Sequence, residues 1–236
     1  MLFRSNCGAT ERVASLDSIM PSDIAAFPTT GLSGLMIRHH AVWGEAHVTD
    51  TVNIGEGAHG GPMRLRRHAL AFSQGNRYLV QQLVHHVIGR LPRDAMIVDL
   101  YAGGGLFSIA AAAYRGARVT AVEGDRFAAA DLTANATASG APVTALHAAV
   151  EMFLARPPEH ADVTIVDPPR TGMSREALDG VLRLRPRQIV YVSCDVATLA
   201  RDTRRMVDGG YTIEGADAFD LFPNTPHVEC VVDLRI

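Results

Sequence analysis

One cysteine and one glutamate stand at the borders of apolar segments, a placement that suits covalent catalysis. Cys194 ends the apolar run that begins at Gln188, and Glu229 comes just before the last apolar stretch of the chain. Open α/β sheets bind ligands at the carboxyl edge of their strands, where a thiol and a carboxylate can act as nucleophile and general base. We therefore interpret Cys194 as the candidate nucleophile and Glu229 as the candidate base.

The surroundings of Cys194 distinguish it from the other two cysteines. A free thiol has a pKa of about 8.5, so it needs a positive neighbour, a helix N-terminus or a base to form a thiolate. A helix expected from residue 197 lies just beyond Cys194, and Ser193 and Asp195 make its surroundings polar. Cys7 lies in an irregular segment and Cys230 inside an apolar strand, so both are interpreted as structural.

A second group of residues suits a nucleoside-containing cofactor. Glycines 103–105 follow an apolar run and open a helix, which allows close approach of the backbone to a ligand. Glu123 ends the next apolar run, 24 positions after Asp99, where an acidic side chain commonly binds ribose hydroxyls. Asp167 precedes two rigid prolines at the same expected edge. The alternative is that the glycines only form a tight turn and Glu123 caps the next helix.

The elements that position these groups alternate regularly from about residue 69. Helices are predicted around 79–87 and at 106–115, 126–139, 150–155, 175–184 and 197–207. Strands are predicted at 96–100, 118–123, 143–146, 162–166, 188–192, 211–219 and 227–234. Repeated βα units predict an α/β fold with a doubly wound, mostly parallel sheet, and the last two strands an antiparallel addition at one edge.

Residues 1–66 show a different pattern. Short apolar pieces at 32–37 and 46–52 alternate with stretches rich in glycine and proline, which predicts a few strands and a loop without an independent core. The chain of 236 residues is long enough for one full domain with a smaller appendage. We predict a small β-rich segment at 1–66 and a catalytic domain at 67–236.

Composition limits the classes of function. No apolar stretch approaches the roughly 20 residues needed to span a bilayer, and no secretory signal is evident, so we expect a soluble, cytoplasmic protein. Three scattered cysteines and adjacent histidine pairs suit neither a metal nor an iron–sulfur cluster. A net charge of −3 argues against nucleic-acid binding by bulk electrostatics, although a local basic face remains compatible with it.

All 22 basic residues are arginine, which suits phosphate contacts but is also typical of a coding bias. Three arginine groups are candidates for contacts to phosphate, the alternative being solvated helix faces. They comprise Arg64, Arg66 and Arg67; Arg183, Arg185 and Arg187; and Arg201, Arg204 and Arg205.

Five segments, taken in order, resemble the S-adenosylmethionine-dependent RNA uracil-C5 methyltransferases, which make 5-methyluridine in ribosomal or transfer RNA. The resemblance covers the chain from about residue 69 onward. The segments are 71–76 (Phe-x-Gln-x-Asn), 99–105 (cofactor loop), 167–170 (Asp-Pro-Pro-Arg), 191–202 (nucleophile motif) and 222–229 (base motif). The resemblance implies a Rossmann-like class I methyltransferase fold with a seven-stranded sheet and an antiparallel edge strand.

The resemblance also implies a mechanism and a site. The Cys194 thiolate would add to C6 of uridine and generate an enolate at C5, which takes the methyl group before Glu229 removes the C5 proton. The residues implied to line the S-adenosylmethionine site are Gln74, Tyr101, Glu123 and Asp167. The implied partner is ribosomal or transfer RNA.

The chain departs from the family mainly in its N-terminal part. Family members usually carry an RNA-binding β-barrel, whereas residues 1–66 look like a reduced middle domain. Leu106 and Ala148 stand where members often offer polar cofactor contacts. Two alternatives stay open: an RNA- or cofactor-binding module without turnover, and a methyltransferase for a small nucleoside-like substrate. A nicotinamide dehydrogenase fits less well, because Ser108 replaces the third glycine of the dinucleotide motif.

Overall fold

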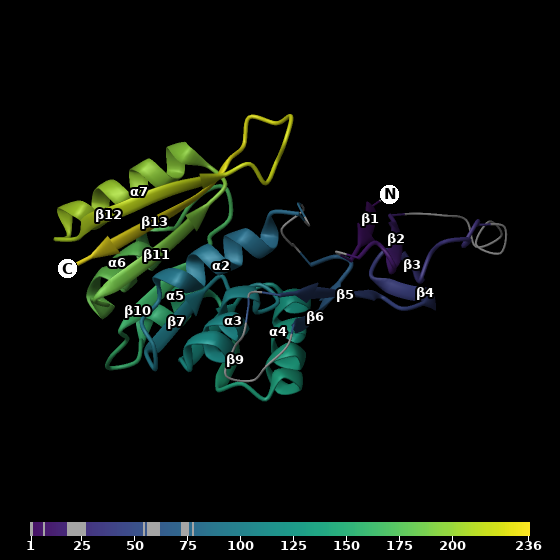
Figure 1. Cartoon of the computed structure of the whole chain (residues 1–236), viewed down its shortest axis with the longest axis horizontal. Coiled ribbons are helices and arrows are strands. Elements are labelled where there is room, and N and C mark those ends of the chain that lie inside the picture. The colour runs from purple at the N-terminus through teal and green to yellow at the C-terminus, as the bar shows by residue number, and fades with distance from the viewer. Residues whose placement is uncertain are drawn as a thin grey trace.

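A seven-stranded sheet forms the centre of the computed structural model, which describes residues 2–6, 8–17, 27–53, 55, 62–71, 76 and 78–236 (Figure 1). Its strands are β7 (Met96–Leu100), β8 (Arg118–Glu123), β9 (Val143–His147), β10 (Val163–Val166), β11 (Gln188–Ser193), β12 (Thr212–Phe219) and β13 (Glu229–Arg235). They lie in the order β12-β13-β11-β10-β7-β8-β9. The strand order reverses beside β7, which places a ligand-binding crevice at the carboxyl ends of β7 and β10.

One strand of this sheet runs against the others. β13 pairs antiparallel with both β11 and β12, whereas β7 to β11 pair in parallel. β12 is the edge strand, so the antiparallel strand lies one place inside the edge. The predicted Rossmann-like fold with seven strands is therefore confirmed, with the antiparallel addition formed by the final two strands.

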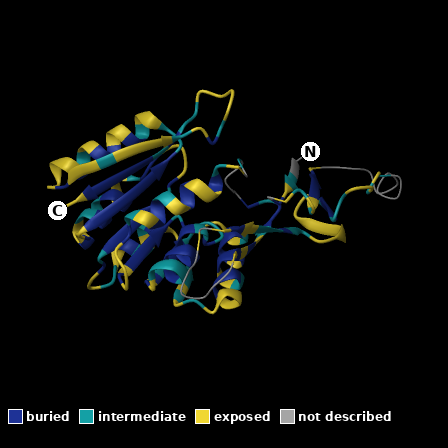
Figure 2. Ribbon diagram, viewed as in Figure 1, coloured by how far each residue is buried: buried dark blue, intermediate teal, exposed yellow. Residues whose placement is uncertain are grey.

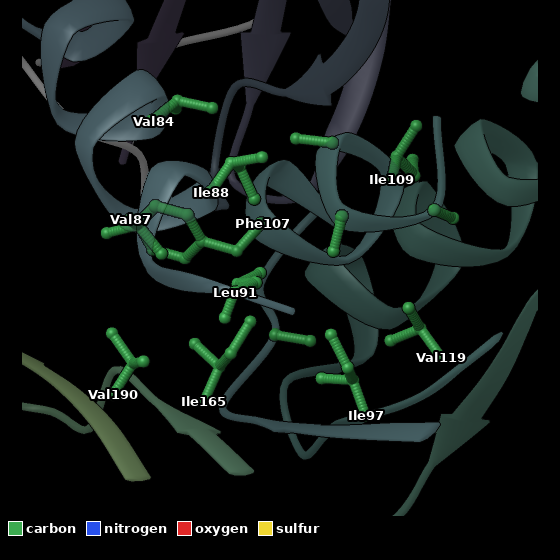
Figure 3. Close-up of a cluster of buried hydrophobic side chains, with 14 of the residues drawn as sticks. Val84, Val87, Ile88, Leu91, Ile97, Phe107, Ile109, Val119, Ile165 and Val190 are labelled. Atoms are coloured by element: carbon green, nitrogen blue, oxygen red, sulfur yellow. The ribbon is translucent and has the colours of Figure 1, made fainter. Parts of the chain in front are cut away.

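Helices cover both faces of the sheet (Figures 1 and 2). They are α2 (Val80–Arg90), α3 (Leu106–Arg115), α4 (Arg126–Ser139), α5 (Val150–Ala155), α6 (Arg175–Leu184) and α7 (Val196–Asp208). Successive strand residues point to opposite faces. Ile97 therefore packs with α2 and α3 (Figure 3), while Val98 packs with α5 and α6. Each fully buried aliphatic side chain contributes about 1.5–3 kcal/mol, so the two layers fix the strand ends.

The N-terminal part forms two smaller sheets. β1 (Leu2–Ser5), β2 (Arg12–Leu16), β3 (Gly34–Ile37) and β4 (His40–Gly44) make a four-stranded sheet. β5 (His47–Val52) and β6 (Met63–His68) form an antiparallel hairpin that packs on α4. The cores of the four-stranded sheet are small, in line with the expectation from the sequence.

The hairpin β5–β6 shares the core of the larger sheet. Val52, Met63 and Leu65 belong to the same buried cluster as α2 and α3. The predicted boundary at residue 66 falls inside β6, and the hairpin packs with the part of the chain that forms the central sheet. Within the described residues, no helix is long and apolar enough to cross a membrane.

Candidate functional site

The ends of β11 and β13 bring the two predicted catalytic residues together. The antiparallel register of these strands pairs Ser193 with Cys230. Glu229 is the first residue of β13 and Cys194 directly follows the last residue of β11, so an extension of this register sets the two opposite each other. Glu229 is almost fully buried, with 1% of its surface exposed, and Cys194 is half-buried. A thiol and a carboxylate that lie far apart in the sequence thus become neighbours.

Electrostatics link these two groups. Burial raises the pKa of the Cys194 thiol, the nearby Glu229 carboxylate raises it further, and a hydrogen bond from Arg170 lowers it. Burial also raises the pKa of Glu229 to about 7. In the cofactor-free protein the thiol therefore keeps its proton at neutral pH, and Glu229 exchanges its proton close to neutrality.

The helix after Cys194 has an acidic cap. Asp195 caps the N-terminus of α7, and its carboxylate accepts a hydrogen bond of 2.9 Å from the backbone N–H of Thr198. Because Asp195 satisfies this end of the helix and places a negative charge there, α7 gives the Cys194 thiolate little stabilisation. Arg170 supplies the positive charge instead.

The predicted cofactor loop is held by Glu123. Its Oε2 atom accepts a hydrogen bond of 2.7 Å from the backbone N–H of Gly103, and Oε1 accepts one of 2.7 Å from Asp125. Asp125, rather than Glu123, caps α4. The cap predicted as an alternative role of Glu123 is therefore wrong, and Glu123 instead joins the ends of β7 and β8.

The backbone of this loop adopts conformations that favour glycine. Gly103 has a φ of 56° and Gly105 a φ of 93°, and Tyr101 adopts a φ of 61° despite its side chain. A Cβ atom on Gly105 would lie 2.8 Å from Cδ1 of Leu132, so α4 packs directly against the loop. Tyr101 is half-buried beside the strand ends.

Carboxylates accumulate at this edge of the sheet. Burial raises the pKa of Asp167 well above its usual range, and Glu229, Asp99 and Glu123 raise it further. Burial likewise raises the pKa of Asp99 to about 7, although the Ser108 hydroxyl donates a hydrogen bond to Oδ2 of Asp99. Within the described residues, the buried Oδ1 atom of Asp99 has no hydrogen-bond partner. No positively charged group is among those that shift the pKa values of Asp99 and Asp167.

The loop that carries Asp167 and Arg170 is anchored on α7. The Thr198 hydroxyl donates a hydrogen bond of 3.1 Å to the carbonyl oxygen of Arg170, and Arg201 donates one of 3.1 Å to that of Thr171. The sequence placed both α7 residues in a motif and Arg201 among the candidate phosphate contacts, but it did not indicate that they hold this loop.

Asp202 completes this anchor from a buried position. Its carboxylate accepts hydrogen bonds of 2.7 Å from the Tyr191 hydroxyl and 2.8 Å from the backbone N–H of Met173. Burial beneath the loop was not evident from the sequence, because Asp202 adjoins the charged Arg201 on an amphipathic helix. Asp202 therefore ties β11, α7 and the end of the Arg170 loop together.

Gln74, the remaining predicted cofactor residue, lies outside the described residues. Its neighbour Asn76 donates a hydrogen bond of 3.2 Å to the carbonyl oxygen of Asp220, so the end of this segment lies against the loop before Glu229. Within the described residues, no group of three or more histidine, cysteine, aspartate or glutamate side chains could hold a metal ion.

Most of the candidate phosphate-binding arginines have protein partners. The ion pairs are Arg66–Asp131, Arg67–Asp50, Arg201–Asp202, Arg204–Asp208 and Arg205–Asp179, and Arg183 donates to the carbonyl oxygen of Leu154. Among the described residues, no side-chain hydrogen bond or ion pair is formed by Arg64, Arg185 or Arg187. The arginines of α7 therefore fit the alternative of a solvated helix face better than that of a phosphate-binding surface.

Comparison with known proteins agrees with this geometry. The family model of the tRNA (uracil-5-)-methyltransferases matches residues 159–236, which include the Asp167 loop, Cys194 and Glu229. The predicted resemblance is confirmed. An uncharacterized RNA methyltransferase of Thermotoga maritima is 40% identical over 167 residues, which are 70% of this chain and 38% of that protein. One of Lactobacillus johnsonii is 31% identical over 207 residues, 84% of this chain and 43% of that protein.

A solved structure extends the similarity to nearly the whole chain. The Pyrococcus abyssi tRNA (uracil-54, C5)-methyltransferase, solved with S-adenosyl-L-homocysteine, has a TM-score of 0.77 and 26% identity. The alignment covers 98% of this chain and 58% of that protein. The chain spans about two fifths of the length of the two curated relatives.

Proposed function

We propose that this chain carries the catalytic unit of an S-adenosylmethionine-dependent methyltransferase that modifies C5 of a uridine in ribosomal or transfer RNA. The observation that carries the proposal is the position of Cys194 beside Glu229 at the joined ends of β11 and β13. The family match over residues 159–236 supports it, because the matched segment includes both residues. The proposal places the activity in residues 67–236 and in the cytoplasm.

The charges of the site fit a cationic cofactor. Burial raises the pKa values of the Asp99, Asp167 and Glu229 carboxyl groups. The negative charges of Glu229, Asp99 and Glu123 repel that of Asp167 and raise its pKa further. A sulfonium ion beside these groups would favour their ionised forms. Glu123 and Tyr101 would hold the nucleoside end, Asp167 the reacting end, and Gln74 is proposed as a further contact.

Cys194 and Glu229 have complementary roles in the proposed reaction. Bound S-adenosylmethionine supplies an electrophilic methyl group. Uracil C5 is a weak nucleophile, so the Cys194 sulfur would first bond to C6, and the C5–C6 π electrons would move into an enolate. C5 would then bond to the methyl carbon as the bond from that carbon to the sulfonium sulfur breaks, with its electron pair staying on sulfur. Glu229 then takes the proton from C5, and the electrons of that C–H bond restore the double bond and expel the Cys194 thiolate.

The proton affinities suit these roles. The pKa of about 7 lets Glu229 accept a proton near neutral pH and release it again to solvent. Arg170 donates a hydrogen bond to Cys194 and lowers its pKa, which favours the thiolate when the site is loaded. Asp202 and Arg201 keep the Arg170 loop in place for this contact.

The test is transfer of a labelled methyl group from S-adenosylmethionine to uridine-containing RNA. Wild type and the Cys230→Ala variant should produce 5-methyluridine, whereas Cys194→Ala should produce none. Transfer by Cys194→Ala would refute the proposed mechanism. Binding of RNA or cofactor by wild type without transfer would indicate a binding module, and preferential methylation of free uridine would indicate a small-molecule substrate.

A further inference from the structure

A buried asparagine joins the N-terminal hairpin to the cofactor loop. Asn135 lies in the middle of α4, and only 3% of its surface is exposed. Its Oδ1 atom accepts a hydrogen bond of 2.9 Å from the backbone N–H of Arg66. Its Nδ2 atom donates bonds of 2.9 Å to the carbonyl oxygens of Arg66 and Gly104. Both amide donors and the acceptor are therefore used, and all three bonds go to the backbone.

The two segments that Asn135 joins also lie against each other. A Cβ atom on Gly104 would lie 3.7 Å from Nδ2 of Asn135 and 4.0 Å from the carbonyl oxygen of Arg66. Strand β6 therefore forms part of the wall behind the glycine loop. On the other side of this loop, Glu123 accepts a hydrogen bond from Gly103. Glu123 and Asn135 hold the loop between them.

A second side chain on α4, that of Asp131, holds the hairpin but, among the described residues, forms no hydrogen bond with the glycine loop. Asp131, one helical turn before Asn135, pairs with Nε of Arg66 at 3.1 Å. It also accepts a bond of 2.5 Å from the backbone N–H of His68 and lies 3.4 Å from Nε2 of His47. An isolated two-stranded hairpin is marginally stable, so these contacts fix its position.

We propose that Asn135 is a positioning residue through which the hairpin β5–β6 fixes the glycine loop for cofactor binding. This inference rests on the proposed cofactor site. Its consequence is that the N-terminal part of the chain, which precedes and includes the hairpin, contributes to cofactor affinity without touching the cofactor. A change in the position of the hairpin would reach the loop through the hydrogen bonds of the Asn135 amide, in addition to the direct packing of β6 behind Gly104.

Two variants of Asn135 separate its roles. Asn135→Ala removes all three hydrogen bonds, whereas Asn135→Asp keeps the acceptor for Arg66 but loses both donors. A carboxylate at this position would also face the carbonyl oxygens of Arg66 and Gly104. Without these hydrogen bonds the glycine loop would be less ordered before binding, and part of the binding free energy would be used to order it. We therefore expect both variants to bind S-adenosylmethionine at least about tenfold more weakly.

The experiment measures cofactor affinity by calorimetry and backbone hydrogen exchange in the cofactor-free protein. In both Asn135 variants, the amides of Gly103 and Gly105 should exchange faster, whereas those of β10 and β11 should keep their wild-type protection. Thr137→Ala is the matched control, because Thr137 lies on the same helix and bonds only within it, to Thr133. It should retain wild-type affinity and exchange.

Asp131→Asn tests whether the position of the hairpin affects the glycine loop through Asn135. It should weaken cofactor binding about two- to threefold in the wild-type background and have no further effect when combined with Asn135→Ala. Affinity and loop exchange that stay within twofold of wild type in both Asn135 variants would overturn the inference, as would full additivity with Asp131→Asn. If wild type binds no cofactor while loop exchange still depends on Asn135, the proposed function fails and the positioning role stands.

Discussion

Replacing Glu229 by glutamine should stabilise the cofactor-free protein at high pH. Burial raises the pKa of Glu229 from 4.5 to about 7, which corresponds to about 3 kcal/mol. Below pH 4.5 the carboxyl group is protonated in both the folded and the unfolded chain, so its burial as an ion does not lower the free energy of unfolding. As the pH rises from 4.5 to about 7, the unfolded chain ionises first and the folded protein loses stability; above pH 7 the full cost applies.

Denaturant unfolding at several pH values provides the assay. At pH 8, Glu229→Gln should be more stable than wild type by up to about 3 kcal/mol, and at pH 4.5 the difference should fall below about 0.5 kcal/mol. The matched control is Glu214→Gln, because Glu214 is exposed on β12 and should show no such pH-dependent difference. The same Glu229→Gln variant should lose methyl transfer by about 10²- to 10⁴-fold.

Two outcomes would refute this reasoning. If Glu229→Gln is less stable than wild type at pH 8, Glu229 makes favourable ionic contacts that outweigh its burial. If the difference in stability does not change between pH 4.5 and 8, the pKa of Glu229 is not raised in the folded protein.

Three further substitutions test the supports of the site. Arg170→Met should raise the pKa of Cys194 and move its alkylation by iodoacetamide to higher pH, as followed by peptide mass; an unchanged pH profile would contradict the Arg170 contact. Gly105→Ala should lower the unfolding free energy by about 1–2 kcal/mol because of its positive φ, and an unchanged unfolding midpoint would disprove this strain. Tyr191→Phe leaves Asp202 without one donor and should cost about 1–3 kcal/mol; a loss below about 0.5 kcal/mol would show that this bond is dispensable.

The sequence predicted the regular part of the fold well. The helices at 106–115, 126–139, 150–155 and 175–184 begin and end where the periodicity and glycines placed them. Every strand of the central sheet was predicted. The inner strands β7, β10 and β11 were identified by apolar runs, because strands covered on both faces need continuous apolar sequence. The order of strands was not evident from the chain, since it depends on packing between distant segments.

The N-terminal part was harder to predict. Strand β6 was missed because Met63 and Leu65 alternate with Arg64 and Arg66, a pattern that extends only over a few residues beside a glycine-rich segment. The structure explains this alternation, because Met63 and Leu65 face the core and Arg66 forms an ion pair with Asp131. Local sequence carries no information about such a distant partner.

For the site, the sequence predicted which groups react but did not indicate which residues hold them in place. Cys194 and Glu229 were recognised by their positions at strand ends, and the register of β11 and β13 explains why they meet. The capping of α7 by Asp195 and the burial of Asn135 depend on geometry that spacing alone does not reveal. These supporting residues are therefore findings of the structure.

Detection of a covalent bond between Cys194 and RNA would test the proposed mechanism most directly. Glu229→Gln should be incubated with S-adenosylmethionine and uridine-containing RNA, separated under denaturing conditions and mapped by mass spectrometry. We expect a methylated protein–RNA adduct at Cys194 that accumulates because the C5 proton is not removed, and that disappears when Cys194→Ala is added. Release of methylated RNA without an adduct, or an adduct that persists without Cys194, would contradict it.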